Sequence, residues 1–152
     1  MADITIYPGK DPGGESSYGS GSAVTLSTSA WTEVGIIRGL TGRRGLATIE
    51  LLVAAQTLAN LKLSGSNRSG AHVTDSEAGG TKVDLLVDAD FLTANSVLDF
   101  VAPAPALPVA VGTRILMRVR VDGLEELGLY AKTSVSGGTL TITRVTLPMA
   151  NR

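Results

Sequence analysis

Cysteine is absent from the sequence, and histidine occurs once, as His72. Without cysteine the chain has no disulfide and no thiolate ligand for a metal, so its stability comes from packing or association. Catalysis through a serine–histidine or cysteine–histidine pair would rest on His72 alone, in the long polar loop 64–81. We therefore expect no catalytic residue, no metal, no cofactor and no enzyme activity.

Charge is also scarce, because charged residues make up 18% of the chain and 13 basic residues nearly balance 14 acidic ones. A net charge of -1 argues against a nucleic-acid partner, since such binding depends on neutralising phosphates. Soluble domains average about 25% charged residues. The low fraction indicates either that a partner covers part of the surface or that glycine, serine and threonine supply neutral polarity.

Long apolar runs are missing as well. None reaches the roughly 18 to 20 residues of a membrane-spanning helix, so we expect no membrane partner. The first residues carry neither the basic start nor the apolar stretch of a signal peptide. We expect a protein that is made in the cytoplasm.

Strand-like patterns occur along the chain and are most regular between residues 112 and 147. From 113 to 121 the side chains alternate, with Ile115, Met117 and Val119 on one face and arginines on the other. Asp122-Gly123 and the glycines at 137 and 138 are turn signals. The pattern predicts a β-meander of three strands whose apolar face is covered by a second layer.

Roughly eight to ten strand-like runs separated by turn signals occur along the chain. They predict an all-β fold, a β-sandwich or jelly-roll-like single domain over residues 23–152. The residues that we expect in its core are Ile115, Met117, Val119, Leu129, Leu140 and Ile142.

Residues 1–22 are predicted to form an extended N-terminal arm and a flexible linker. DITIY, residues 3–7, is a short strand candidate that ends at Pro8, and the linker GGESSYGSGS is too poor in apolar residues to pack. The arm is either frayed or docked. If docked, it adds to a sheet edge of its own subunit or of a neighbour.

The candidate interface combines this arm with one aromatic residue and one strand face. Trp31, the single tryptophan, is interpreted as a core or interface anchor rather than a stacking platform for a sugar or base. The arginine row suits either the carboxylates of a partner or acidic residues on neighbouring strands. The candidate partner-interface residues are Ile4, Ile6, Tyr7, Trp31, Arg114, Leu116, Arg118 and Arg120.

A resemblance of style to one group of proteins extends over the whole chain. It is carried by the arm DITIYPG, the linker GGESSYGSGS, the cysteine-free Thr/Val/Gly-rich strands and the hairpin KTSVSGGTLTITRVTL. In these features the chain resembles the small decoration, or cement, proteins of tailed-bacteriophage capsids. The resemblance implies a structural protein of the virion that is a homotrimer, binds the major capsid protein on the outside of the capsid and stabilises the shell.

Two other functions stay open at this point. One is a carbohydrate-binding or adhesin-like β-sandwich module of a phage fibre, although 4% aromatic residues and one tryptophan give little stacking surface. The other is a different structural protein of the phage head or tail, which composition does not distinguish from a decoration protein.

Overall fold

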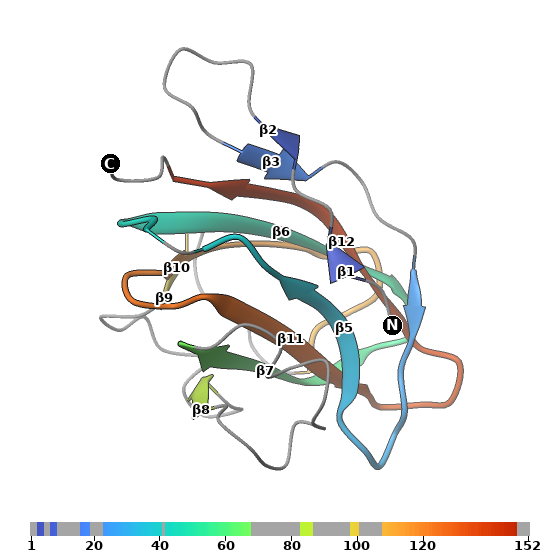
Figure 1. The fold of residues 1–152 in the computed structure, drawn as a ribbon. Coiled ribbons are helices and arrows are strands. Elements are labelled where there is room, and N and C mark those ends of the chain that lie inside the picture. The colour runs from blue at the N-terminus through green and yellow to red at the C-terminus, as the bar shows by residue number, and fades with distance from the viewer. Residues whose placement is uncertain are drawn as a thin grey trace.

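A computed structural model describes residues 3–4, 7–8, 16–18, 23–40, 42–67, 83–86, 98–100 and 108–148, and it describes side chains within 23–40, 42–67 and 108–148. These residues form strands, turns and loops without a helix, arranged in the two layers of a sandwich (Figure 1). The predicted all-β fold is confirmed. The strands are β1 (Asp3–Ile4), β2 (Tyr7–Pro8), β3 (Ser16–Tyr18), β4 (Val24–Thr25), β5 (Thr32–Ile37), β6 (Leu46–Ala55), β7 (Leu58–Ser66), β8 (Val83–Leu86), β9 (Leu98–Phe100), β10 (Arg114–Arg120), β11 (Glu126–Thr133) and β12 (Thr139–Leu147).

Sheet A has the strand order β1-β5-β11-β7-β8, and sheet B has the order β2-β3-β12-β6-β10-β9 with β4 also paired to β12. All pairs are antiparallel except β1 and β5. Strands that follow each other in the chain often lie in different sheets, as β5 and β6 or β6 and β7 do. The chain therefore winds around the core, and each layer is assembled from distant parts of the sequence.

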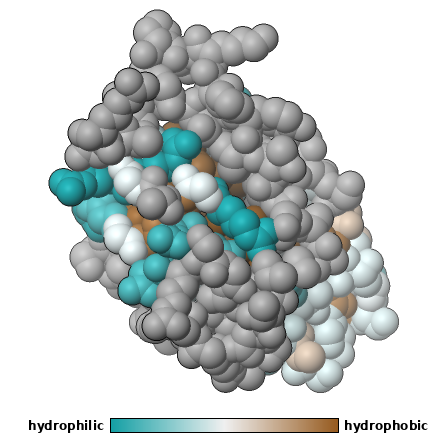
Figure 2. Space-filling view, in the orientation of Figure 1, coloured by the Kyte–Doolittle hydropathy of each residue, from teal (hydrophilic) through white to brown (hydrophobic). Residues whose placement is uncertain are grey.

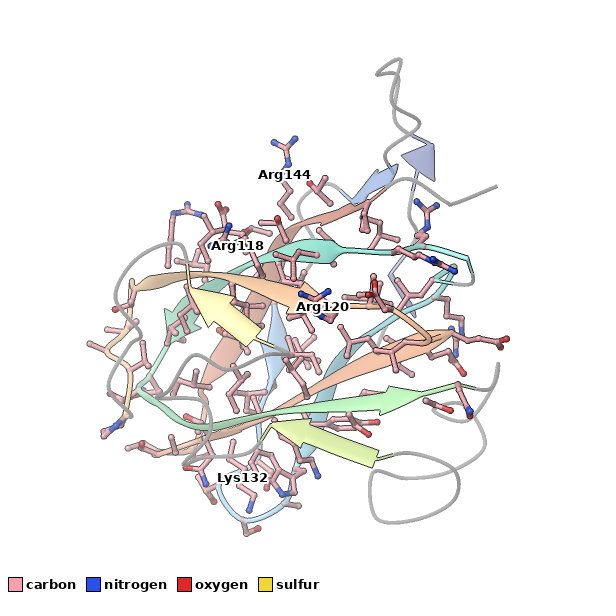
Figure 3. All side chains as sticks on the ribbon, turned by 90° about the vertical axis from the view of Figure 1, so that its left-hand side faces the viewer. Arg118, Arg120, Lys132 and Arg144 are labelled. Carbon is pink, nitrogen blue, oxygen red and sulfur yellow. The ribbon has the colours of Figure 1, made fainter. Side chains whose placement is uncertain are left out.

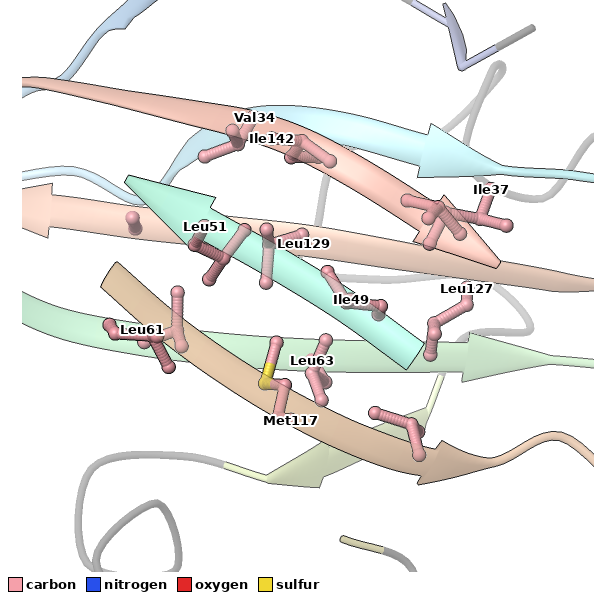
Figure 4. Packing of buried hydrophobic residues seen from close by; sticks show 14 of the residues in the cluster. Val34, Ile37, Ile49, Leu51, Leu61, Leu63, Met117, Leu127, Leu129 and Ile142 are labelled. Atoms are coloured by element: carbon pink, nitrogen blue, oxygen red, sulfur yellow. The ribbon is translucent and has the colours of Figure 1, made fainter. Parts of the chain in front are cut away.

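The core lies between the two inner faces. Met117 of β10 stands opposite Ile49 of β6 in sheet B, and Leu63 of β7 stands opposite Leu129 of β11 in sheet A. Figure 4 shows these side chains meeting between the layers. Burying each such side chain contributes roughly 1.5–3 kcal/mol, so packing supplies the stability of a chain without disulfides. The predicted core residues Ile115, Met117, Val119, Leu129, Leu140 and Ile142 are all buried.

The predicted β-meander is wrong, although its three strands exist. β10 and β12 both flank β6 in sheet B, while β11 lies between β5 and β7 in sheet A. The chain crosses from one sheet to the other at both turns, where Gly123 and Gly137 take positive φ values of 78° and 89°. The three strands do not form one meander because β11 is buried over nearly its whole length and occupies the centre of the other sheet.

Parts of the N-terminal arm pair within the same chain. Ile4 of β1 stands beside Ile37 of β5, and β3 pairs with β12. Ser16–Tyr18, predicted as part of a flexible linker, is therefore a strand. The described parts of the arm thus pair within their own chain, and docking of the arm on a neighbouring subunit stays a prediction.

Hydrophilic side chains dominate the described surface in Figure 2, and hydrophobic atoms appear there mainly in the gaps between them. Among the described residues the large exposed hydrophobics are Leu46, Val111 and Val135, which belong to three separate segments. The polar character of the described surface thus rests on threonine, serine and a few charges, as the composition indicates.

Candidate functional site

Four arginines mark the outer face of sheet B, and we call them the arginine face: Arg114, Arg118, Arg120 and Arg144. Three of them alternate along β10 with the buried Ile115, Met117 and Val119, so their side chains leave the opposite face of the strand. Positions two apart on a strand are roughly 6.5–7 Å apart, so Arg118 and Arg120 are neighbours on this face, whereas Arg114 lies two such steps from Arg118.

A β-bulge in β12 brings the fourth arginine to this face. Ile142 pairs with Leu51 and Arg144 pairs with Glu50, which leaves Thr143 as the extra residue. The bulge reverses the alternation, because Leu140 and Ile142 point inward before it and Val145 and Leu147 point inward after it. Arg144 therefore points away from the sheet, as Figure 3 shows.

Arg144 is not among the interface residues predicted from the sequence. The signal was present as a change of phase, since the apolar positions 140 and 142 are followed by 145 and 147 instead of 144 and 146. Read with the two-residue period of a strand, that change predicts a bulge at Thr143 or Arg144.

Glu50 lies between the arginines of β10 and β12. Its Oε1 atom accepts a hydrogen bond from Nη1 of Arg114 at 3.2 Å and lies 2.7 Å from Oγ1 of Thr143. Thr143 Oγ1 is also 3.1 Å from the backbone oxygen of Glu50. The bulge residue thus fixes the carboxylate, and the carboxylate in turn holds Arg114 in place.

Positive charge exceeds negative charge on this face. Glu50 pairs with Arg114 on the face, and Asp122 pairs with Arg120 at its edge. Asp99 of β9 stands opposite Arg118 in the strand register. The side chain of Arg114 is 60% exposed, and Arg144 is exposed and has no ion pair within the described part of the chain. Leu116, half-buried opposite Glu50, is the apolar residue between Arg114 and Arg118.

The end of β10 is braced by an aspartate. Oδ1 of Asp122 accepts the backbone N–H of Gly45 at 2.5 Å, and Oδ2 accepts a hydrogen bond from Arg120 at 3.3 Å. The hydrogen bond from Gly45 lowers the pKa of Asp122 below its ordinary value, and Arg120 lowers that pKa further. Arg120 is thereby held at the edge of the arginine face.

A second polar cluster lies on the outer face of sheet A, and we call it the tryptophan–lysine cluster: Trp31, Lys62, Tyr130 and Lys132. Nζ of Lys62 is 4.8 Å from the ring centroid of Trp31 and 5.3 Å from that of Tyr130. Nζ of Lys132 is 4.5 Å from the same Trp31 centroid. Two ammonium groups therefore share one indole ring.

Strand register explains why these residues meet. Lys62 stands directly opposite Tyr130, and Lys132 is two residues further along β11 on the same face. Lys62 is 2% exposed, whereas Trp31 and Lys132 are half-buried and reach solvent. Cation–π contacts with two aromatic rings offset part of the cost of burying the Lys62 ammonium.

A hydrogen-bonded turn fixes the position of Trp31 before β5. Oγ of Ser27 accepts the backbone N–H groups of Ser29 and Ala30, each at 3.1 Å. The backbone N–H of Ser27 donates to Oγ1 of Thr32 at 3.0 Å. The loop that carries the tryptophan is therefore ordered by its own serine and threonine side chains.

The predicted interface residues do not form one surface. Arg114, Leu116, Arg118 and Arg120 come together on sheet B, whereas Trp31 belongs to the other layer of the sandwich. Ile4 and Tyr7 are placed by backbone pairing only, and Ile6 lies outside the described residues. His72 and most of its polar loop, residues 68–82, also lie outside them.

Within the described ranges, no three histidine, cysteine, aspartate or glutamate side chains gather as metal ligands. In the same part of the chain, no helix is long and apolar enough to cross a membrane.

Comparison with known proteins gives no relative for this chain. No protein-family model, no curated protein and no solved structure matches it.

Proposed function

We propose that the protein is a non-catalytic structural protein of a tailed-phage virion, and that it binds the outside of the capsid through the arginine face. The observation that carries the proposal is the arrangement of four arginines on one sheet face, where Glu50 pairs with Arg114 and Asp122 pairs with Arg120 at the edge. The resemblance to decoration proteins supplies the capsid as the partner.

An acidic, flat protein surface is the partner that suits this face. Guanidinium groups bind carboxylates with paired, directional hydrogen bonds, and Arg is favoured over Lys at such contacts. The pairs that Arg114 and Arg120 make within the chain are exposed, and exposed pairs contribute only about 0–1 kcal/mol each. A partner carboxylate can therefore replace them at little cost.

Stability of the sandwich is independent of this contact. The core beneath the arginine face is formed by the inward residues of β6, β10 and β12, whereas the arginines stand on the other side of the same strands. Arginine substitutions should thus change binding and leave the fold intact, which makes the proposal testable by mutation.

The test is co-sedimentation of the protein with shells assembled from the major capsid protein of the same phage. The double variant Arg114→Gln/Arg144→Gln removes two exposed charges from the face. At roughly 0.7 kcal/mol for each contact, its affinity should fall about tenfold. Raising the salt from low concentration to about 1 M, where the Debye length is about 3 Å, should weaken wild-type binding in the same direction.

Lys132→Gln is the matched control, because it removes one positive charge from the opposite layer and should leave capsid binding unchanged. Thermal unfolding of each variant shows whether the fold is intact. Equal binding of wild type and double variant would refute a role of the arginine face. The homotrimer stays a prediction, which light scattering after size exclusion checks directly.

A further inference from the structure

We propose that copies of this chain associate through one end of the sandwich, which we call the neutral end. It is formed by four described loops, at residues 26–31, 54–58, 109–113 and 134–138. These loops lie where β6 and β11 end and where β7, β10 and β12 begin (Figure 1). The proposal assigns a self-association surface, and only its consequence for capsid binding rests on the proposed function.

Charge is missing from the neutral end. Its four loops read LSTSAW, AAQTL, VAVGT and SVSGG, without an acidic or basic residue. The loops at the opposite end of the same strands, residues 38–45 and 121–125, contain three arginines, an aspartate and a glutamate. The charged residues closest to the neutral end along the strands are Glu33, Arg114 and Lys132, and they stand on the outer faces of the two sheets.

Two valine side chains project from this end. Val111 is 56% exposed and Val135 is 55% exposed. Turns usually carry Gly, Asn, Asp or Ser, because these residues supply the backbone geometry that a turn needs. A β-branched apolar side chain does not supply that geometry, and more than half of each valine adds nothing to the core. Both side chains are therefore available for contact with a partner.

Backbone hydrogen bonds hold the loops of the neutral end together. The N–H of Leu58 donates to the oxygen of Val109 at 2.9 Å, and the N–H of Val109 donates to the oxygen of Leu58 at 2.8 Å. The N–H of Ser134 donates to the oxygen of Thr57 at 2.9 Å. The two loops that carry the exposed valines are thus attached to adjacent residues of one turn. A surface that is already ordered loses little conformational entropy when it associates.

A second copy of the chain is the partner that suits a surface without charge. A symmetric contact brings the same surface of two copies together, so a charged surface would meet its own charge and be repelled. The neutral end avoids this repulsion, and it offers no counter-charge to an acidic or basic partner. The centres of protein interfaces are likewise depleted of charge. The arginine face has the opposite character, because two copies of it would repel each other.

Association through the neutral end leaves the arginine face of each copy uncovered, since that face is the outer side of sheet B. Exposed arginine contacts are individually weak. Several arginine faces carried by one oligomer bind a repeating capsid lattice at the same time, which raises the overall affinity. Under the proposed function, the oligomer therefore binds capsids more tightly than a single copy does.

The test is light scattering after size exclusion of the full-length protein, over the micromolar range and without capsids. We expect a mass above the 15.6 kDa of one chain. The double variant Val111→Lys/Val135→Lys should raise the dissociation constant of the oligomer at least tenfold, because association would bury like charges. Leu46→Lys is the matched control: it replaces the third exposed hydrophobic residue, 38% exposed and at the opposite end of β6, and should leave the mass unchanged.

Salt gives an independent measurement on the wild-type protein. Association through a neutral surface should persist at about 1 M salt, where the Debye length is about 3 Å. Urea unfolding shows whether each variant is folded. If the double variant does not fold, the salt series on the wild type decides between a neutral and a charged contact.

The proposal is overturned if the wild type has the mass of one chain throughout, if its association weakens as salt is added, or if the double valine variant associates as the wild type does. A wild-type monomer that loses capsid binding in the double valine variant would assign the neutral end to the capsid instead. Arg114→Gln/Arg144→Gln should associate as the wild type does. A failure of the arginine face in capsid binding is therefore distinguishable from a failure of the neutral end.

Discussion

Replacing Gly138 by alanine should destabilise the fold at a place where two strand ends approach closely. A Cβ atom at position 138 would overlap with the Cβ and Oγ1 atoms of Thr133. Gly138 precedes β12 and Thr133 ends β11, so the overlap lies where the chain passes from sheet A to sheet B. The close approach therefore requires glycine.

Neither partner in this overlap can move away cheaply. The oxygen of Gly138 accepts the N–H of Leu26 at 2.8 Å, and the N–H of Thr133 donates to Ser27 at 3.0 Å. The hydroxyl of Thr133 is 3.2 Å from the oxygen of Thr57 and 3.0 Å from that of Val135. Rotating the side chain gives up this hydroxyl's hydrogen bond, and rotation does not move the overlapping Cβ.

Overpacking of a buried site costs typically 1–3 kcal/mol, and the lost hydrogen bond adds about 1 kcal/mol. We expect Gly138→Ala to lower the free energy of unfolding by about 3 kcal/mol, which is a large part of the roughly 5–15 kcal/mol of a typical domain. For a chain of this size the melting temperature should fall by about 6–12 °C.

Urea unfolding followed by far-UV circular dichroism measures the loss of stability. Gly137→Ala is the control, because its Cβ meets no atom within 4 Å and only the φ of 89° opposes it, at about 1 kcal/mol. In a Thr133→Gly background, Gly138→Ala should cost less than about 0.5 kcal/mol, since the overlapping atoms are gone. Equal stability of Gly138→Ala and Gly137→Ala would refute the close approach of the two strand ends.

Two further predictions concern the core and the braced turn. Val119→Ala should lower the unfolding free energy by about 2 kcal/mol because Val119 is fully buried, whereas Val111→Ala, at a residue 56% exposed, should change it by less than about 0.5 kcal/mol in the same urea assay. Asp122 has a lowered pKa in the folded state, so its charge stabilises the fold at any pH above the unfolded carboxyl pKa of about 3.9. This contribution is lost as the pH falls through the pKa of Asp122 in the folded protein. Asp122→Asn keeps an acceptor for Gly45 and removes the charge, so the difference in urea midpoint between the two proteins should shrink from pH 6 to about pH 3; a constant difference would contradict the assignment.

Sequence patterns predicted the strands and the buried faces well where alternation was regular. In β10 the separation of Ile115, Met117 and Val119 from the arginines is confirmed, because a two-residue period and a one-sided core determine it. Alternation does not say which strand becomes the neighbour. The predicted meander failed for that reason, since β11 joined the other sheet.

The candidate sites could be predicted only in part, for a related reason. The arginines of β10 share one strand and one face, so local periodicity was enough to group them. The tryptophan–lysine cluster draws Trp31, Lys62 and Lys132 from three segments whose register is set by tertiary pairing. A buried lysine such as Lys62 is also not expected from sequence, because its burial depends on the aromatic rings around it.

The position of β12 has a consequence for the order in which the protein can fold during synthesis. β12 is the last described strand in the chain, yet it lies between β3 and β6 and also pairs with β4, all of which emerge from the ribosome much earlier. Until β12 is available, one edge of β6 lacks its native partner and the inner face of sheet B lacks Leu140, Ile142 and Val145. Sheet B therefore completes late, through pairing between distant segments, and such pairing is slow because loop closure precedes it. During this interval the ten-residue strand β6 has an open edge that can pair with other nascent chains. The edge of β6 is therefore the place where aggregation during synthesis should begin.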